Sequence, residues 1–445
     1  MLRRTTFWLA IAILFSTQSC LVVNNPYPAM APGTWRAVLQ IDPSYISPNK
    51  KGEPLPEKLN LKFEEVTKGQ LPFNFEVIYT EEEGDHFVID LINGEERIRI
   101  PEDQIYFGRD LQTAKDTIRI EFPLYESYIT GLYEEDTFEG KYVVSTRDNY
   151  EIPFIAKHGE GHRFTQLKKE PMMDISGSWA VQFGLDTDDP YPGVGEFTQA
   201  GNKLTGTFRT ETGDYRYLEG SVQDNKIYLS VFDGSHAFLF EGKILPDTTI
   251  IGSFRSGKHY QTTWEAKRSD DLSLTSPYEL TQVTGESNIL DISFPNPDGE
   301  MVSLQDPAFA GKAKIVQIMG TWCPNCRDET TFLVNYLKEN PKEDLAVLGL
   351  AFEKHRSLDK AGPLLKKYRE RMGIPYPLLY GGYYNKKEAT QQLPMLSEII
   401  SYPTLLFLDK ENRVVKIHTG FDGPATSRYA DFVQEFDEIV KGLIQ

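Results

Sequence analysis

The sequence predicts a multidomain protein, in which an antiparallel all-β region (a barrel or sandwich, in one unit or duplicated) precedes an α/β domain. With 445 residues the chain is longer than one ordinary core requires, so two or three domains are expected. Short runs of alternating apolar and polar residues fill residues 35–267, which is typical of antiparallel strands. Beyond residue 287, continuous apolar runs and helical periodicity replace this alternation.

The chain is acidic, with 47 Lys and Arg against 65 Asp and Glu and a formal net charge of -18. Most of this excess lies before Gly285, in the all-β region. Proteins that bind nucleic acids present a basic surface to the phosphates. The composition therefore argues against a nucleic-acid partner.

The amino terminus has the pattern of a secretion signal over residues 1–19. Two arginines precede an apolar run at residues 7–15, and small polar residues lead to Cys20. Nine apolar residues are too few to span a bilayer. The placement of Cys20 resembles a bacterial lipoprotein signal, in which this cysteine would be lipidated and hold the protein at a membrane. The alternative is an ordinary signal peptide with an incidental cysteine. Both predict export to the cell envelope, on the periplasmic side, where disulfides form.

The all-β region is expected to contain one β-domain at residues 30–168 and a second at 174–268, followed by a polar linker at 269–287. A weak duplication supports two units, since Gly-Thr-Trp at 33–35 recurs as Gly-Ser-Trp at 177–179. A Gly-x-Trp start resembles the first strand of calycin-type barrels. Recurrent turn residues in any β-rich chain remain the alternative.

Residues 288–445 are expected to alternate strands and helices. Pro363 is placed in the first turn of its helix, because a proline is tolerated there, and Gly373 is placed at the helix end. The order is that of a thioredoxin fold. The expected elements are a hairpin at 289–294 and 301–304, a buried strand at 314–319, a helix at 326–340, a buried strand at 345–352, a helix around 364–372, a hairpin at 404–408 and 414–418, and a closing helix at 429–443.

Cys323 and Cys326 follow the first buried strand and begin a helix. The only other cysteine is Cys20, so the two thiols have no partners but each other. Amides at a helix amino terminus stabilise a thiolate, and Cys323 is nearer to that terminus. Cys323 is therefore the expected nucleophile of a pair that exchanges electrons with other disulfides.

Residues from about 285 to 445 resemble the thioredoxin-like domain of exported TlpA/ResA-type thiol-disulfide oxidoreductases. The resemblance rests on the Gly-Thr-Trp-Cys-Pro-Asn-Cys segment at 320–326, on Tyr-Pro-Thr at 402–404, and on the turn at 409–412. It implies that Cys323 attacks, that Cys326 resolves the mixed disulfide, and that the two form the redox disulfide. It also implies a cis bond before Pro403 and a substrate groove formed by Trp322, Pro324, Tyr402, Pro403 and Thr404.

A proton acceptor for Cys326 is expected as well. Gln317 occupies the position where thioredoxins keep a buried Asp, and it cannot ionise. The resembling family carries a Glu at the end of the next strand, and Glu353 fits that position. The alternative for Glu353 is a solvated strand-end residue paired with Lys354 or Arg356.

Three other interpretations fit parts of the sequence. A zinc site at the cysteine pair would need two further ligands that the scattered histidines do not supply. A thiol peroxidase would use Thr321 beside Cys323. A binding protein would act through the β-region and its aromatic residues, although 23 Tyr and 26 Phe are more often used in cores.

The sequence thus predicts an enzyme that reduces or isomerises disulfides of cell-envelope proteins, with no bound cofactor and no metal. The expected partners are disulfide-containing envelope proteins, a dithiol electron donor, and a membrane reached through lipidated Cys20.

Overall fold

The computed structural model of the chain describes residues 29–41, 69–79, 87–112, 114–269, 273–285 and 287–445. The expected signal at residues 1–19 and the expected lipid anchor Cys20 lie outside these ranges. None of the helices within the described ranges combines the length and the apolar character needed to cross a bilayer.

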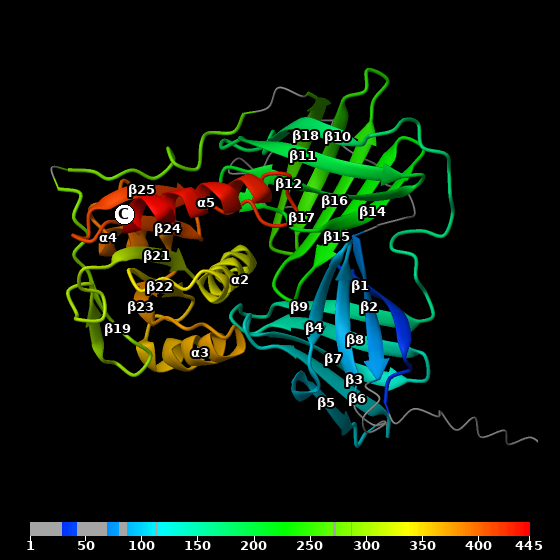
Figure 1. Cartoon of the computed structure of the whole chain (residues 1–445). Coiled ribbons are helices and arrows are strands. Elements are labelled where there is room, and N and C mark those ends of the chain that lie inside the picture. The colour runs from blue at the N-terminus through cyan, green and yellow to red at the C-terminus, as the bar shows by residue number, and fades with distance from the viewer. Residues whose placement is uncertain (1–28, 42–68, 80–86, 113, 270–272, 286) are drawn as a thin grey trace, which may run out of the picture.

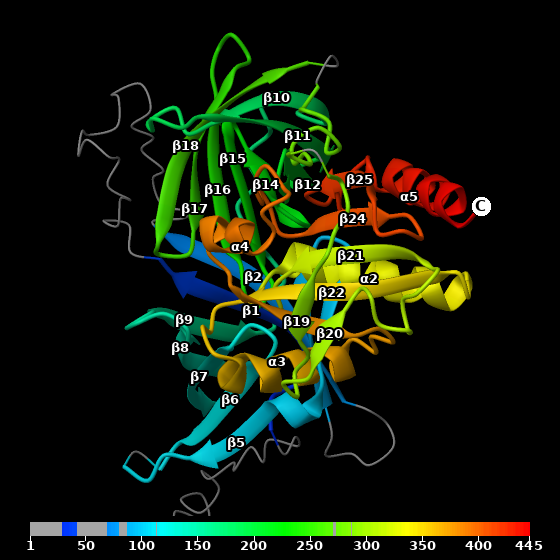
Figure 2. The same cartoon turned by 90° about the vertical axis from the view of Figure 1, so that its left-hand side faces the viewer.

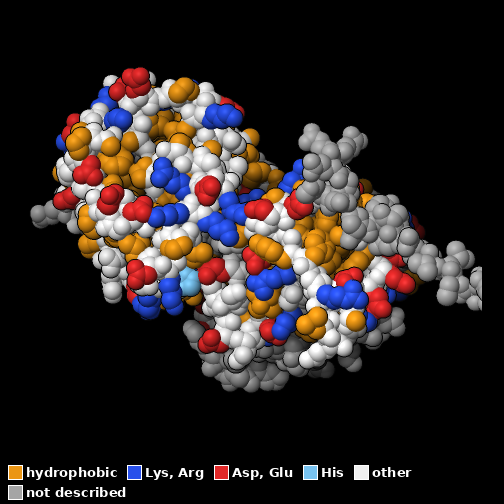
Figure 3. Space-filling model, turned by 90° about the horizontal axis from the view of Figure 1, so that it is seen from below, with side chains coloured by type: hydrophobic (Ala, Val, Ile, Leu, Met, Phe, Trp, Pro, Cys, Tyr) orange, Lys and Arg blue, Asp and Glu red, His pale blue; other side chains and the backbone are white. Residues whose placement is uncertain are grey.

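Three bodies form the molecule (Figure 1): two β bodies lie on one side and an α/β body on the other. Viewed from the side of the α/β body, the second β body lies above the α/β sheet and the first lies below it (Figure 2). Acidic and basic side chains are interspersed over the face seen from below (Figure 3).

The first β body is a nine-stranded antiparallel sheet in the order β4-β3-β2-β1-β9-β8-β7-β6-β5. Buried Ile118, Ile120 and Phe122 alternate with more exposed residues along β6, as the period of a strand requires. The sheet curves into a half-barrel whose free edges are β4 and β5. Its elements are β1 (Gly33–Gln40), β2 (Gln70–Tyr79), β3 (Phe87–Asn93), β4 (Glu96–Ile100), the 3-10 helix η2 (Glu102–Gln104), β5 (Ile105–Arg109), β6 (Asp116–Phe122), β7 (Ser127–Glu134), β8 (Thr137–Val144) and β9 (Glu151–His158).

The second β body is a closed antiparallel barrel. Its sheet runs β11-β10-β18-β17-β16-β15-β14-β12-β13, and an additional pairing of β11 with β12 closes the ring. Closure removes the free edges that the half-barrel retains. Its strands are β10 (Gly177–Phe183), β11 (Tyr191–Ala200), β12 (Lys203–Thr210), β13 (Gly213–Asp214), β14 (Leu218–Gln223), β15 (Lys226–Phe232), β16 (Ala237–Ile244), β17 (Ile250–Ser256) and β18 (Tyr260–Arg268).

The two β bodies begin in the same way. In each, the first strand pairs with the second strand and with the last. Gly33 and Gly177 both have φ of 103°, a conformation that favours glycine. The indole N–H of Trp35 donates to a carbonyl four residues earlier at 2.9 Å, and that of Trp179 does the same at 2.8 Å. Two β units with the same Gly-x-Trp start are thus present in the structure, one open and one closed.

Aromatic side chains fill the closed barrel. Phe208, Phe240, Phe254 and Trp264 are all buried. The ring centroid of Phe240 lies 4.6 Å from that of Phe208 and 4.4 Å from that of Phe254. Rings packed in this way form a core, as in small barrels whose interiors are filled by side chains.

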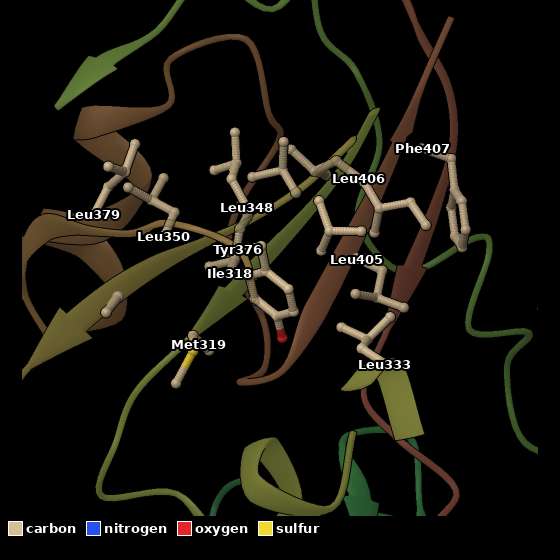
Figure 4. Packing of buried hydrophobic residues seen from close by; sticks show 14 of the residues in the cluster. Ile318, Met319, Leu333, Leu348, Leu350, Tyr376, Leu379, Leu405, Leu406 and Phe407 are labelled. Atoms are coloured by element: carbon tan, nitrogen blue, oxygen red, sulfur yellow. The ribbon is translucent and has the colours of Figure 1, made fainter. Parts of the chain in front are cut away.

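The α/β body has the thioredoxin-like order predicted from the sequence. Its sheet runs β23-β22-β21-β24-β25, with β21 and β22 in parallel pairing and β24 antiparallel to β21. Figure 4 shows Leu348 of β22 and Leu406 of β24 on one side of the sheet, and Leu405 of β24 beside Leu333 of α2 on the other. Its elements are β19 (Ser293–Pro295), β20 (Met301–Ser303), β21 (Ala313–Met319), α2 (Pro324–Glu339), β22 (Leu345–Glu353), α3 (Leu358–Arg371), β23 (Leu378–Tyr383), α4 (Lys386–Gln392), β24 (Thr404–Leu408), β25 (Val414–Thr419) and α5 (Tyr429–Ile444).

Two local expectations are wrong. Pro363 lies inside α3 rather than in its first turn, because the helix already begins at Leu358. As the proline has no N–H, the helical hydrogen bond to the carbonyl of Asp359 is absent there. The hairpin strand expected from Ile289 is reduced to β19, because Ile289 instead bridges to Arg413 next to the β24–β25 turn. The sequence also gave no indication of β23 and α4.

Candidate functional site

The cysteine pair lies where β21 ends and α2 begins. Every residue of β21 is buried, which places its end in the middle of the sheet. Pro324 is the first helical residue, where its missing N–H is not needed. Cys323 is the N-cap of α2, and its sulfur accepts a hydrogen bond from the backbone N–H of Cys326 at 3.2 Å. The helix amino terminus therefore points its amides at the Cys323 sulfur.

The two thiols, both free, have different environments. Cys323 is 7% exposed and Cys326 is fully buried. Burial, followed by the hydrogen bond to Cys323, raises the pKa of the Cys326 thiol well above its usual value. Cys326 therefore stays protonated until a base removes its proton.

The loop before β24 faces the pair. The peptide bond between Tyr402 and Pro403 is cis, as predicted. The Cys323 thiol donates to the Tyr402 carbonyl at 3.5 Å. Thr404 is fully buried, and its hydroxyl donates to the Ser401 carbonyl at 2.9 Å, so it shapes the loop from within.

Trp322 forms a wall beside the pair. Its indole N–H donates to the Phe352 carbonyl at 2.9 Å, which fixes the ring orientation. The ring centroid lies 5.3 Å from that of Tyr384 and 5.6 Å from that of Tyr402. The predicted groove residues Trp322 and Tyr402 thus contact each other.

Glu353 ends β22 and is 1% exposed. Its carboxylate accepts from the backbone N–H of Thr321 at 2.9 Å and from the Thr321 hydroxyl at 2.8 Å. Burial raises its pKa, and the two Thr321 hydrogen bonds act in the opposite direction. The alternative of a solvated residue paired with its neighbours is wrong, because Arg356 pairs with Glu388 and Lys354 lies over the Trp322 ring.

Glu329 is a second buried carboxyl group, which the sequence analysis missed. It lies on α2 three residues after Cys326, on the same helix face. Its Oε2 accepts from the side-chain amide of Gln317 at 2.9 Å, and its Oε1 has no hydrogen-bond partner among the described residues. Burial raises the pKa of Glu329 well above its usual value, and its charge in turn raises the pKa of Cys326. The sequence feature that could have pointed to Glu329 is its spacing of three residues from Cys326 on the same helix.

The closed barrel covers one side of this site. The Ser401 hydroxyl donates to the Thr212 carbonyl at 2.7 Å, beside the cis-proline loop. The side-chain amide of Asn325, between the two cysteines, donates to the Asp214 carbonyl at 3.3 Å. The β12–β13 turn of the barrel thus lies directly against the cysteine pair and its facing loop.

Arg216 joins all three bodies. It is 1% exposed and forms ion pairs with Glu96 of the half-barrel, Asp233 of the closed barrel and Asp328 of α2. The distance from its Nε to the Asp233 carboxylate is 3.2 Å. The arginine therefore ties both β bodies to the helix that carries the cysteines.

In the described ranges, no group of three or more His, Cys, Asp or Glu side chains is placed to hold a metal ion. What the site offers instead is a pair of thiols of unequal accessibility beside buried carboxyl groups. Such a pair exchanges electrons with disulfides through a mixed disulfide. The carboxyl-terminal third of this chain is a thioredoxin-like thiol-disulfide oxidoreductase domain.

Comparison with known proteins agrees with this class. Residues 284–432 match the family model described as Redoxin. The thioredoxin-like protein YneN of Bacillus subtilis is 28% identical over 130 residues, which are 29% of this chain and 68% of that protein. The thiol-disulfide oxidoreductase ResA of Halalkalibacterium halodurans is 21% identical over 144 residues, which are 32% of this chain and 70% of that protein.

Solved structures are similar to the same third of the chain. A thiol:disulfide interchange protein of the thioredoxin family from Chlorobium tepidum TLS is 26% identical, covers 36% of this chain and 99% of its own, and has a TM-score of 0.28. A thiol-disulfide oxidoreductase from Bacteroides fragilis is 16% identical, covers 34% of this chain and 99% of its own, and has a TM-score of 0.26.

Proposed function

We propose that this chain is an exported thiol-disulfide oxidoreductase that reduces or isomerises disulfides in proteins of the cell envelope. The observation that carries the proposal is the unequal pair at the start of α2, in which Cys323 keeps a small exposed fraction of 7% and Cys326 is fully buried. A nucleophile must reach its substrate, whereas a resolving thiol needs only to reach the nucleophile.

The exchange proceeds in two steps. The Cys323 thiolate attacks one sulfur of the substrate disulfide, the substrate S–S bond breaks, and the departing sulfur leaves as a thiolate that takes up a proton. The Cys326 thiolate then attacks the Cys323 sulfur and releases the second substrate thiol. The substrate gains two electrons and two protons, and the protein is left with a Cys323–Cys326 disulfide. A dithiol electron donor restores the thiols.

The second step needs a base for Cys326. Glu329 has an oxygen without a hydrogen-bond partner among the described side chains, and its charge acts on Cys326. Both oxygens of Glu353 are bonded to Thr321. We assign proton acceptance from Cys326 to Glu329, and we keep Glu353 as a candidate that acts through the loop bearing Cys323.

Among the predicted groove residues, Trp322 and Tyr402 are assigned to direct substrate contact, because they form the wall beside Cys323. Pro403 shapes the loop that carries the Tyr402 carbonyl, and the buried residues Pro324 and Thr404 support the groove from inside the domain. An extended segment next to the substrate disulfide would lie along this loop.

Membrane attachment is assigned to Cys20, as the lipidated first residue after the signal. The support is the sequence pattern at residues 1–19. The expected electron donor is then a dithiol in or near the same membrane.

A peroxidase is less well supported by the geometry. In that mechanism Thr321 would serve the sulfur of Cys323, but its hydroxyl donates to Glu353 at 2.8 Å.

The proposal is tested by disulfide exchange of the full mature chain with insulin and dithiothreitol. We expect turnover by the wild type and none by Cys323→Ser, and we expect Cys326→Ser to hold insulin as a covalent adduct when dithiothreitol is left out. Cys20→Ser is the matched control, which should keep full exchange activity and leave the membrane fraction of expressing cells. Equal activity of the Cys323→Ser variant and the wild type would overturn the proposal.

A further inference from the structure

A cavity of about 290 Å³ lies where the three bodies meet, next to Trp322. The β8–β9 loop contributes Arg147, the loop after β15 contributes His236, the loop after β17 contributes His259, and the end of β22 leads to Lys354. These segments are far apart in the sequence. Figure 1 shows α2 on the side of the α/β body that faces both β bodies, and Trp322 lies just before this helix.

The lining of this cavity is unusual for so acidic a chain. It contains an arginine, a lysine and two histidines, together with aromatic and small polar side chains, and no Asp or Glu. Within the part of the chain that the structure describes, neither Arg147 nor Lys354 forms an ion pair with a carboxylate; their contacts are with the rings of Tyr150 and Trp322. Some other exposed cations do have acidic partners, such as Lys141 with Glu151 at 2.7 Å.

These cations act on one another. Burial and the charge of Arg147 lower the pKa of Lys354. Burial and the charges of Arg147, His236 and Lys354 lower the pKa of His259 to about 3. Like charges gathered at a partly desolvated site repel each other, and an anion between them relieves that repulsion.

Three carboxylates act on these groups without lining the cavity. Asp233 pairs with the His236 ring nitrogen at 3.2 Å and also with Arg216. Glu126 contacts the His355 ring at 2.8 Å, and Glu126 and Glu353 both raise the pKa of Lys354. None of the three forms an ion pair with Arg147 among the described residues.

The cavity is also close to the reacting sulfur. Trp322 separates it from the cis-proline loop, and the Ser235 hydroxyl donates to the Trp322 carbonyl at 3.4 Å. The charge of Cys323 acts on Lys354. A group bound in the cavity would therefore lie a short distance from a disulfide under attack by Cys323.

We propose that this cationic cavity binds a carboxylate that lies next to the substrate disulfide, so that the β-region takes part in substrate selection. The inference rests on the proposed function, because it names the substrate class of the same cysteine pair. Arg147 and Lys354 supply the positive charges, and the aromatic wall of Trp322 and Tyr384 accommodates the carbon chain between carboxylate and sulfur.

The test uses three small disulfides that share a core of two –CH2–CH2– units joined by the disulfide and differ in their end groups. Dithiodipropionate carries two carboxylates, hydroxyethyl disulfide is neutral, and cystamine carries two ammonium groups. Each is reduced by the full mature chain with dithiothreitol as the electron source, and kcat/KM is measured. Each variant is compared with the wild type on the same disulfide, so that differences in intrinsic reactivity among the three cancel.

The variants are Arg147→Gln and Lys354→Gln, with Lys141→Gln as a control that removes one positive charge outside the cavity. We expect each cavity variant to lower kcat/KM for dithiodipropionate relative to hydroxyethyl disulfide by about threefold to tenfold, and to raise the relative value for cystamine. For Lys141→Gln, the ratio of kcat/KM for dithiodipropionate to kcat/KM for hydroxyethyl disulfide should equal that of the wild type.

Two results overturn the inference: unchanged ratios in both cavity variants, or an equal loss with all three disulfides, which would place the effect on the thiol. Absence of exchange with every disulfide, in the wild type, would instead overturn the proposed function. Cystine-bridged peptides flanked by Asp or by Asn then show whether the carboxylate is read on a protein chain, where the Asp peptide should be favoured only when Arg147 and Lys354 are present.

Discussion

Glu329 accepts a hydrogen bond from Gln317 inside the thioredoxin-like domain, with 2.9 Å between the carboxylate Oε2 and the amide Nε2. The amide also lies 3.5 Å from the carbonyl of Cys326. Gln317 therefore links the carboxyl group of Glu329 to the backbone of Cys326, and the charge of Glu329 acts on the buried thiol. β21 thus contributes Gln317, a group that cannot ionise, and the buried acid next to it belongs to α2.

Replacing Glu329 by Gln should slow the resolving step. The amide cannot accept the Cys326 proton, and general-base catalysis contributes on the order of 10²- to 10⁴-fold. In the wild type, decay of the mixed disulfide should accelerate as the pH rises through the raised pKa of Glu329; in Glu329→Gln this dependence should disappear. Stopped-flow measurement of the decay checks this. A pH profile identical to that of the wild type would remove Glu329 from the mechanism, and Glu353→Gln, measured in parallel, shows whether the other carboxyl serves instead.

The same substitution should stabilise the protein at neutral and higher pH. Because the folded-state pKa of Glu329 is raised, the folded protein holds its proton more tightly than the unfolded chain does. Stability is therefore lost as the pH rises above the unfolded value of about 4.5 and through the folded pKa. Glu329→Gln should gain on the order of 1–3 kcal/mol over the wild type at pH 8 and little at pH 4. Calorimetric unfolding at both pH values measures the gain, with exposed Glu343→Gln as the control that should show none.

Removing Arg216 should weaken the whole assembly. Arg216→Met leaves the carboxylates of Glu96, Asp233 and Asp328 without their common cation, and breaking a buried ion pair costs about 3–5 kcal/mol. The exposed pair of Lys141 and Glu151 is the comparison, and Lys141→Met should cost less than about 1 kcal/mol. Urea unfolding gives both values. Similar losses in the two variants would show that Arg216 does not hold the three bodies together.

The local features of the α/β domain could be predicted because they depend on neighbouring residues. A buried strand that ends at a cysteine pair, and a proline before an apolar strand, determine where Cys323 and Pro403 lie. Likewise, the two Gly-x-Trp segments indicated a duplicated β unit. Closure could not be predicted from the sequence. Alternation does not reveal whether a sheet closes into a ring, as the pairing of β11 with β12 closes the second body, or stays open, as the first body does between β4 and β5.

The site was predicted only where a motif marks it. Arg327, Asp328 and Glu329 are consecutive charged residues on α2, and the sequence alone does not show that Glu329 points into the interior while Asp328 meets Arg216. The cationic cavity is assembled from segments of all three bodies. The residues next to Arg147 and Lys354 in the sequence therefore do not indicate that these two side chains lie at one cavity.

The central claim is that Cys323 reaches the substrate and Cys326 resolves the adduct from within. Mass spectrometry of the chain after reaction with a disulfide-bonded peptide, without added reductant, tests it most directly. We expect Cys326→Ser to retain one peptide on Cys323, the wild type to retain none and to contain a Cys323–Cys326 disulfide, and Cys323→Ser to stay unmodified. A stable adduct on Cys326 in the Cys323→Ser variant, formed as fast as the adduct on Cys323, would contradict the account.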